Sequence, residues 1–231
     1  MTTLSDAPKI APPSLWKTLG ELKALRGLGK ALLARRSPAQ RSNGDPVLVL
    51  PGLGTNDAAT ELLRHHLELA GYDVHTWNQG INRGPRDGVM RKLSQRVRAI
   101  ARSTQRPVRI VGWSLGGLIA RMVAGRVPVA VESVVALGSP LNADPAASHL
   151  SSVYAALGGR DSRDPAVRAM LRDGAKVPVT SIYSRDDGVV AWQASVDAQG
   201  ECHAREVAST HFGMMVDSDV HEVVAQALAR R

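Results

Sequence analysis

The sequence contains little cysteine and few aromatic residues. Cys202 is the single cysteine among 231 residues, which excludes an internal disulfide and a metal site built from several cysteines. Aromatic residues make up only 3% of the chain, so a hydrophobic core must be mainly aliphatic. No uncharged apolar run approaches the roughly 18 residues that a membrane-spanning helix needs. The N-terminus lacks the basic-then-apolar order of a secretory signal. A cytoplasmic location fits these features, and a secreted mature chain fits them as well.

Positive charge is concentrated near the N-terminus. The formal net charge is +8, and residues 1–45 carry 8 basic and 3 acidic residues, a net +5. No basic patch with interleaved aromatics occurs, so a nucleic acid is not an expected partner. Leucines at three- and four-residue steps predict an amphipathic helix over 14–34, and SPAQRSNGDP (37–46) predicts a linker. The basic segment 14–36 either contacts an anionic membrane surface peripherally or packs on the rest of the chain with its charges in solvent.

Apolar runs alternate with helix-like stretches after the linker. The expected strands are 47–52, 72–77, 108–113, 133–140, 179–184 and 203–208. The expected helices lie near 57–70, 87–104, 115–126 and 218–230. This order predicts an α/β domain over 46–231, with a mainly parallel sheet of about six strands and helices on both faces. Residues 139–178 interrupt the alternation and contain two Asp-Pro helix starts, which predicts a helical insertion and a candidate lid.

The stretch GWSLGG, residues 112–117, places Ser114 between two glycines. It follows the apolar run 108–113 and precedes a stretch with an apolar helical face, so the pattern predicts strand, sharp turn, helix. Such a turn strains the serine backbone and brings strand and helix close together, which requires small residues at Gly112 and Gly116. The G-x-S-x-G pattern also arises by chance. The strand before it and the helix after it favour a nucleophilic Ser114.

This turn resembles the nucleophile turn of the α/β-hydrolase family, and the resemblance covers about residues 46–231. In that family the loop after the first strand supplies one oxyanion donor, and the residue after the nucleophile supplies the other. The corresponding loop here is VLVLPGLGTND. The resemblance therefore implies an oxyanion hole made by the backbone N–H groups of Leu53 and Leu115. The alternative is that PGLG is an ordinary turn.

A closer similarity is to a bacterial lipase/esterase-like subgroup of the family. In that subgroup a Gly-x-Asn-x-Gly-Pro turn follows the second strand, and here Gly80, Asn82, Gly84 and Pro85 match it. GSPLNADP after the fourth strand is also similar, whereas STHFGMM contains fewer glycines than the subgroup's usual loop.

The family order implies an acid and a base after the serine. VTSIYSRDDGVV predicts a strand followed by Asp186 and Asp187, and the family's pattern before Gly-Val-Val favours Asp187. Either aspartate could instead only form the turn. Of the seven histidines, His211 alone follows the sixth expected strand directly and precedes the final helix. The resemblance thus implies a catalytic triad of Ser114, Asp187 and His211.

Such a triad implies a serine hydrolase that cleaves carboxylic esters, lipid-like or with a small uncharged acyl group, through an acyl-enzyme. It requires no metal and no organic cofactor. An acyltransferase or thioesterase with the same triad is the alternative, and a non-catalytic binding protein with this fold is a further one. Trp77, Trp113 and Trp192 are candidates for the walls of a substrate pocket, and each could equally be a core residue.

Overall fold

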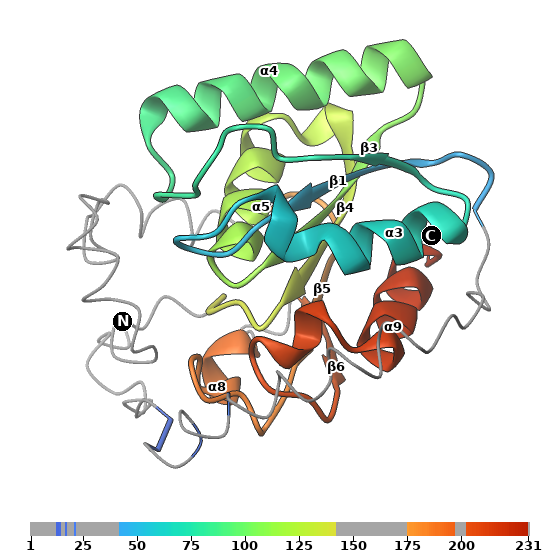
Figure 1. Cartoon of the computed structure of the whole chain (residues 1–231). Helices are drawn as coiled ribbons and strands as arrows, with labels where there is room; N and C mark the ends of the chain where they lie inside the picture. Colours follow the sequence, from blue (N-terminus) through green and yellow to red (C-terminus); the bar gives the residue numbers. More distant parts are fainter. Residues whose placement is uncertain are drawn as a thin grey trace, which may run out of the picture.

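Six parallel strands form a single sheet in the computed structural model, which describes residues 13, 14, 17, 21, 42–141, 175–196 and 202–230. The strands are β1 (Pro46–Leu50), β2 (Asp73–His75), β3 (Val108–Trp113), β4 (Val131–Leu137), β5 (Val179–Tyr183) and β6 (Cys202–Glu206). Their order across the sheet is β2-β1-β3-β4-β5-β6, and every neighbouring pair is parallel. The carboxyl ends of all six strands therefore meet at one edge of the sheet (Figure 1).

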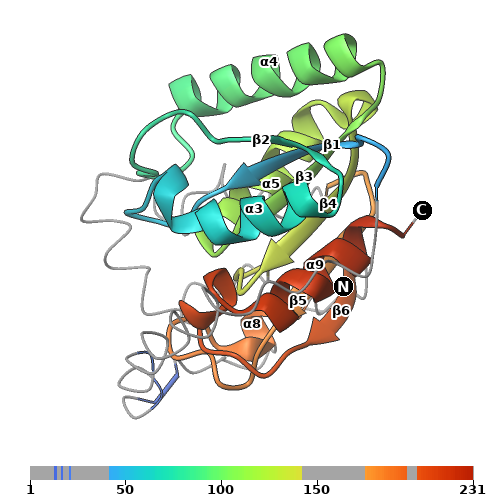
Figure 2. The ribbon, with the colours of Figure 1, turned by 45° about the vertical axis from the view of Figure 1, so that its right-hand side comes forward.

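Helices cover both faces of this sheet. The longer helices are α3 (Glu61–Leu69), α4 (Asp87–Thr104), α5 (Leu115–Arg126) and α9 (Ser218–Leu228). The shorter ones are η2 (Asp57–Thr60), η3 (Pro128–Ala130), α8 (Trp192–Ser195) and η5 (Gly213–Met215). Figures 1 and 2 show α4 and α5 on one face and α3 and α9 on the other.

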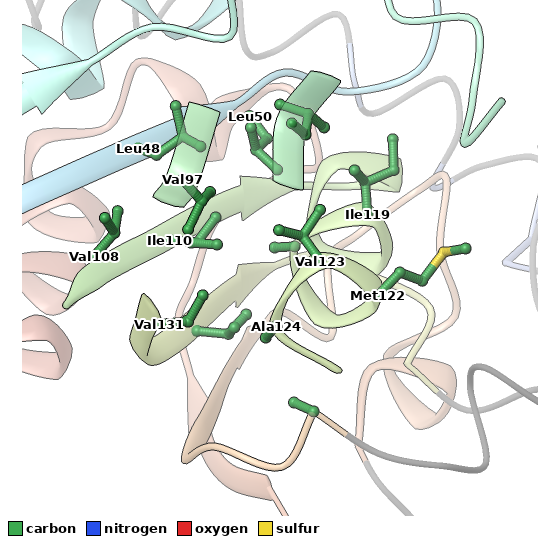
Figure 3. Packing of buried hydrophobic residues seen from close by; sticks show 14 of the residues in the cluster. Leu48, Leu50, Val97, Val108, Ile110, Ile119, Met122, Val123, Ala124 and Val131 are labelled. Atoms are coloured by element: carbon green, nitrogen blue, oxygen red, sulfur yellow. The ribbon is translucent and has the colours of Figure 1, made fainter. Parts of the chain in front are cut away.

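The core is divided between the two faces by the alternation of side chains along each strand. In β1, Leu48 and Leu50 pack with α4 and α5, whereas Val47 and Val49 pack with α3 and α9. Figure 3 shows the first of these clusters, in which Ile110 of β3 contributes to the same packing. The central strands β1 and β3 are buried along their whole length, as expected for a sheet covered on both sides.

The predicted α/β architecture is confirmed. All six expected strands are present with ends shifted by a few residues, and the helices expected near 57–70, 87–104, 115–126 and 218–230 are present. Sequence patterns missed α8, because four residues are too few to establish a helical period. The expected helix over 14–34 lies outside the described residues except for Ser14, Lys17 and Glu21, as do residues 142–174 of the expected insertion. Within the described part of the chain, no helix has both the length and the apolar character to cross a bilayer.

A pair of buried histidines joins α3 to α9. The rings of His66 and His221 lie 5.7 Å apart, and Nε2 of His66 is 3.6 Å from the carboxylate of Glu222. Burial lowers the pKa of His221 to about 4, with a further contribution from the neighbouring His66. Burial also lowers the pKa of His66, although Glu222 opposes that shift.

These shifts predict a loss of stability in mild acid. The unfolded His221 imidazole titrates near 6.5 and the folded one near 4, so the unfolded state binds more protons between these values. The free energy of unfolding should therefore fall by roughly 3 kcal/mol as the pH drops from about 6.5 to about 4. His66 adds to the loss in the same direction. Urea unfolding at a series of pH values should show that the free energy of unfolding of His221→Gln depends less steeply on pH. The exposed His65→Gln is the matched control, and an equal dependence in both variants would contradict the assignment.

Candidate active site

Ser114 occupies the turn between β3 and α5 in a strained conformation. Its φ is +55° and its ψ is −123°, a region that costs a non-glycine residue about 1–3 kcal/mol. A Cβ on Gly112 would clash with the backbone of Gly116, and a Cβ on Gly116 would lie 2.5 Å from the carbonyl oxygen of Leu50. The two glycines are therefore needed because β1, β3 and α5 approach one another there through their backbones.

The loop after β1 lies against this serine. A Cβ on Gly52 would be 3.3 Å from the Cβ of Ser114. The N–H of Leu115 is the first in α5 and so has no acceptor within the helix. In the part of the chain that the structure describes, the N–H of Leu53 has no hydrogen-bond partner either. Neither predicted oxyanion donor therefore gives its backbone N–H to an acceptor in the described part of the chain.

Asn82 holds the loop after β1 in place. Its side-chain amide donates to the carbonyl of Pro51 at 2.7 Å, and its backbone exchanges hydrogen bonds with Gly54 and Thr55 at 2.8 Å each. Its side-chain oxygen accepts the N–H of Gly84 at 2.9 Å. Asn82 is fully buried, and it is the asparagine of the Gly-x-Asn-x-Gly-Pro turn. That turn therefore fastens the loop that carries Leu53.

Asp187 and His211 form a buried pair beyond the ends of β5 and β6. Oδ2 of Asp187 lies 2.7 Å from Nδ1 of His211, and the two residues are 3% and 2% exposed. The other carboxylate oxygen accepts the N–H groups of Val189 at 2.8 Å and Val190 at 2.7 Å. Asp187 thus both shapes its turn and orients the histidine. Asp186 is exposed, and its N–H donates to the hydroxyl of Ser184.

Two neighbours hold the histidine beside the serine turn. The indole N–H of Trp113, the residue before Ser114, donates to the carbonyl of His211 at 3.1 Å, and the two rings are 5.3 Å apart. Gly138 follows β4 with a φ of +50°. A Cβ there would lie 3.0 Å from Oδ2 of Asp187 and 3.1 Å from Nδ1 of His211. Gly138 therefore leaves the space that the aspartate–histidine pair fills.

The three tryptophans occupy different environments. Trp113 contacts His211, as described above. Trp77 is 1% exposed and belongs to the core between the sheet and α4, which favours the alternative interpretation as a core residue. Trp192 is half-buried, stacks on Tyr183 with ring centroids 5.9 Å apart, and lies under the guanidinium of Arg185.

Sequence reasoning missed three contributors to this site. Gly138 was detectable only as a glycine directly after a buried strand, and its contact with the pair spans the fold. The sequence suggests Trp113 as a candidate pocket wall and gives no signal for the contact of its indole with His211. Glu21 accepts the backbone N–H of His211 at 2.9 Å. Its only signal in the sequence is that it is an acidic residue in a basic segment.

No protein-family model and no curated protein matches the sequence, whereas many solved structures match the fold. A monoacylglycerol lipase from Paleococcus ferrophilus matches with a TM-score of 0.55 and 17% identity, over 80% of this chain and 95% of that one. A lipase from Bacillus licheniformis matches with a TM-score of 0.59 and 14% identity, over 82% and 94%. Lipase B from Aspergillus fumigatus matches with a TM-score of 0.62 and 17% identity, over 100% and 62%. The chain therefore has the α/β-hydrolase fold.

The roles of Asp186 and Asp187, in the turn after β5, can be tested separately. Asp187→Asn should lower kcat for ester hydrolysis by about 10⁴-fold, because an amide cannot hold the imidazole in the tautomer that leaves Nε2 as the base. Asp186→Asn should leave kcat near that of the unmodified protein, because its side chain is exposed. Initial rates with a nitrophenyl ester measure both. A larger loss from Asp186→Asn would reverse the assignment.

Gly138→Ala tests the space around the pair. Its methyl group requires Asp187 or His211 to move by a few tenths of an ångström. A misplacement of about 1 Å can cost about 100-fold, so this smaller shift should lower kcat by about tenfold. Gly44→Ala is the matched control, because Gly44 has a φ of +76° with no atom within 4 Å of the added Cβ. It carries the same backbone strain far from the site. Equal activity in the two variants would show that Gly138 has only a conformational role.

Proposed function

We propose that this protein is a serine hydrolase that cleaves carboxylic esters through an acyl-enzyme, with Ser114 as nucleophile, His211 as base and Asp187 as orienting acid. The observation that carries the proposal is the buried hydrogen bond of 2.7 Å between Asp187 and Nδ1 of His211 at the sheet edge where the strained Ser114 lies. A serine hydroxyl is a weak nucleophile alone, and a base oriented by a carboxylate activates it.

Acylation follows from these positions. With the proton of the neutral imidazole on Nδ1, Nε2 of His211 carries the lone pair that removes the proton of Ser114. The serine Oγ attacks the ester carbonyl carbon, and the carbonyl π electrons move to the oxygen. The N–H groups of Leu53 and Leu115 stabilise that oxyanion. When the tetrahedral intermediate collapses, the bond to the alcohol oxygen breaks, and His211 gives the alcohol its proton.

Deacylation repeats the cycle with water as the nucleophile. His211 removes a proton from water, the resulting oxygen attacks the acyl carbon, and Ser114 leaves with the proton that His211 returns. Asp187 remains ionised and stabilises the imidazolium in both halves. Each half begins and ends with the same protonation of the enzyme, so no other reactant is needed.

An uncharged ester is the proposed substrate class. The ring of Phe212 is 48% exposed and lies 5.6 Å from the rings of His211 and Trp113, so it offers apolar surface next to the base. The fold neighbours are described as lipases and esterases, including a monoacylglycerol lipase, which supports the same class. Apolar surface beside the base favours acyl chains without charge.

Serine-directed labelling tests the proposal. A fluorophosphonate probe should label the unmodified protein and fail to label Ser114→Ala, which should also lower kcat by about 10⁶-fold on nitrophenyl esters. Ser103→Ala is the matched control, because Ser103 is an exposed serine on α4 away from the site. Labelling that persists in Ser114→Ala would refute the nucleophile. A series of acyl chain lengths, with and without a lipid interface, then defines the preferred ester.

A further inference from the structure

The carboxylate of Glu21 reaches the two loops that carry Asp187 and His211. Its Oε1 accepts the N–H of Gly188 at 2.8 Å and the N–H of His211 at 2.9 Å. Its Oε2 accepts the N–H of Phe212 at 3.0 Å. Glu21 is 9% exposed, so these contacts are largely shielded from water. The Glu21 side chain thus bonds the backbone next to Asp187 and the backbone of His211. The three residues that it bonds lie 167 to 191 positions later in the chain.

The chemistry of these contacts favours a specific attachment. A buried carboxylate is costly unless hydrogen bonds replace its water, and three backbone N–H groups do so here. Hydrogen bonds to a charged acceptor are roughly twice as strong as neutral ones. In return, the three N–H groups are satisfied without any regular secondary structure in the loops.

Other bonds between the two loops lie closer to the sheet. The N–H of Val207 donates to the carbonyl of Tyr183 at 2.8 Å, and the N–H of Ser209 donates to the hydroxyl of Ser184 at 3.3 Å. In each loop, the residues that make these bonds precede Asp187 or His211 in the chain. Glu21 bonds the loops at His211 itself and at the residue that follows Asp187, so it acts where the geometry of the pair is set.

A second contact attaches the same part of the chain. Nζ of Lys17 donates to the carbonyl of Arg185, two residues before Asp187, at 2.6 Å. Lys17 and Glu21 are four positions apart, the spacing that would place both side chains on one face of the helix expected there. Of the two interpretations of the basic segment, these contacts favour packing on the domain at Lys17 and Glu21.

We infer that Glu21 is a positioning residue of the active site, whose carboxylate holds the acid loop and the histidine loop at the separation that the Asp187–His211 hydrogen bond requires. This inference rests on the proposed triad. Glu21 touches no reacting atom, and it acts through the backbone of residues that do.

Two variants of the full-length protein test the inference. Glu21→Ala removes all three acceptors and should lower kcat by about 100-fold with little change in KM, because the base is misplaced while the substrate surface remains. Glu21→Gln keeps one oxygen for Gly188 and His211 but turns an amide donor toward the N–H of Phe212. The fall in kcat should therefore be smaller, about tenfold. Nitrophenyl ester kinetics on protein shown to be folded by circular dichroism give both numbers.

A proton spectrum gives a readout that does not depend on turnover. The proton between Nδ1 of His211 and Asp187 should give a resonance far downfield, and Asp187→Asn identifies it by removing it. That resonance should shift or broaden in Glu21→Ala and change less in Glu21→Gln. If the unmodified protein shows the resonance but neither cleaves esters nor labels at Ser114, the proposed function fails while the positioning role is still measured.

Glu61→Ala is the matched control, because Glu61 is an exposed carboxylate on α3 away from these loops. It should leave kcat and the resonance unchanged. Unchanged kcat and an unchanged resonance in both Glu21 variants would overturn the positioning role. A fall in kcat that only follows the fraction of unfolded protein would overturn it as well.

Discussion

The close approach of three backbones around Ser114 is the constraint on which the rest of the site depends. β3 enters the turn, α5 leaves it, and β1 passes beside them, with no room for a side chain at Gly112 or Gly116. This contact forces Ser114 to a positive φ and places the first N–H groups of α5 beside it. It also brings the loop after β1 against the serine. The positions of the proposed nucleophile and of the two proposed oxyanion donors are therefore consequences of one packing contact.

The aspartate–histidine pair depends on a different principle, which is full satisfaction of buried polar groups. Burying a carboxylate is unfavourable unless hydrogen bonds replace its water. Asp187 meets this requirement through Val189, Val190 and His211. Around the pair, Trp113 bonds the carbonyl of His211 and Glu21 bonds its N–H, so the backbone of the histidine is held on two sides. The geometry of the site is thus maintained by groups that do not themselves react.

The strands and helices were predictable because their patterns are local. A strand buried on both faces is a short apolar run, and a helix with one buried face repeats its apolar residues every three or four positions. Gly112 and Gly116 were equally readable from the local pattern around Ser114. The atoms that exclude a Cβ at Gly112 lie four and five residues away, although those that exclude one at Gly116 belong to the distant Leu50 and Pro51. Gly138 and Glu21 were not readable in this way, because each acts on residues distant in the chain. The four residues of α8 were too few to show a period.

The sequence by itself determined the order of strands and helices, the strained serine turn, and the set of loops from which an acid and a base could come. Both Asp186 and Asp187 follow the same strand, and the sequence favoured Asp187 only through its resemblance to the family's pattern. Only the tertiary structure decided that Asp187 lies inward against His211 while Asp186 is exposed. It alone placed Glu21 against both loops. The physical reason is that hydrogen bonding requires atoms within about 3 Å, and the folded sheet, not the local pattern, sets which distant residues come that close.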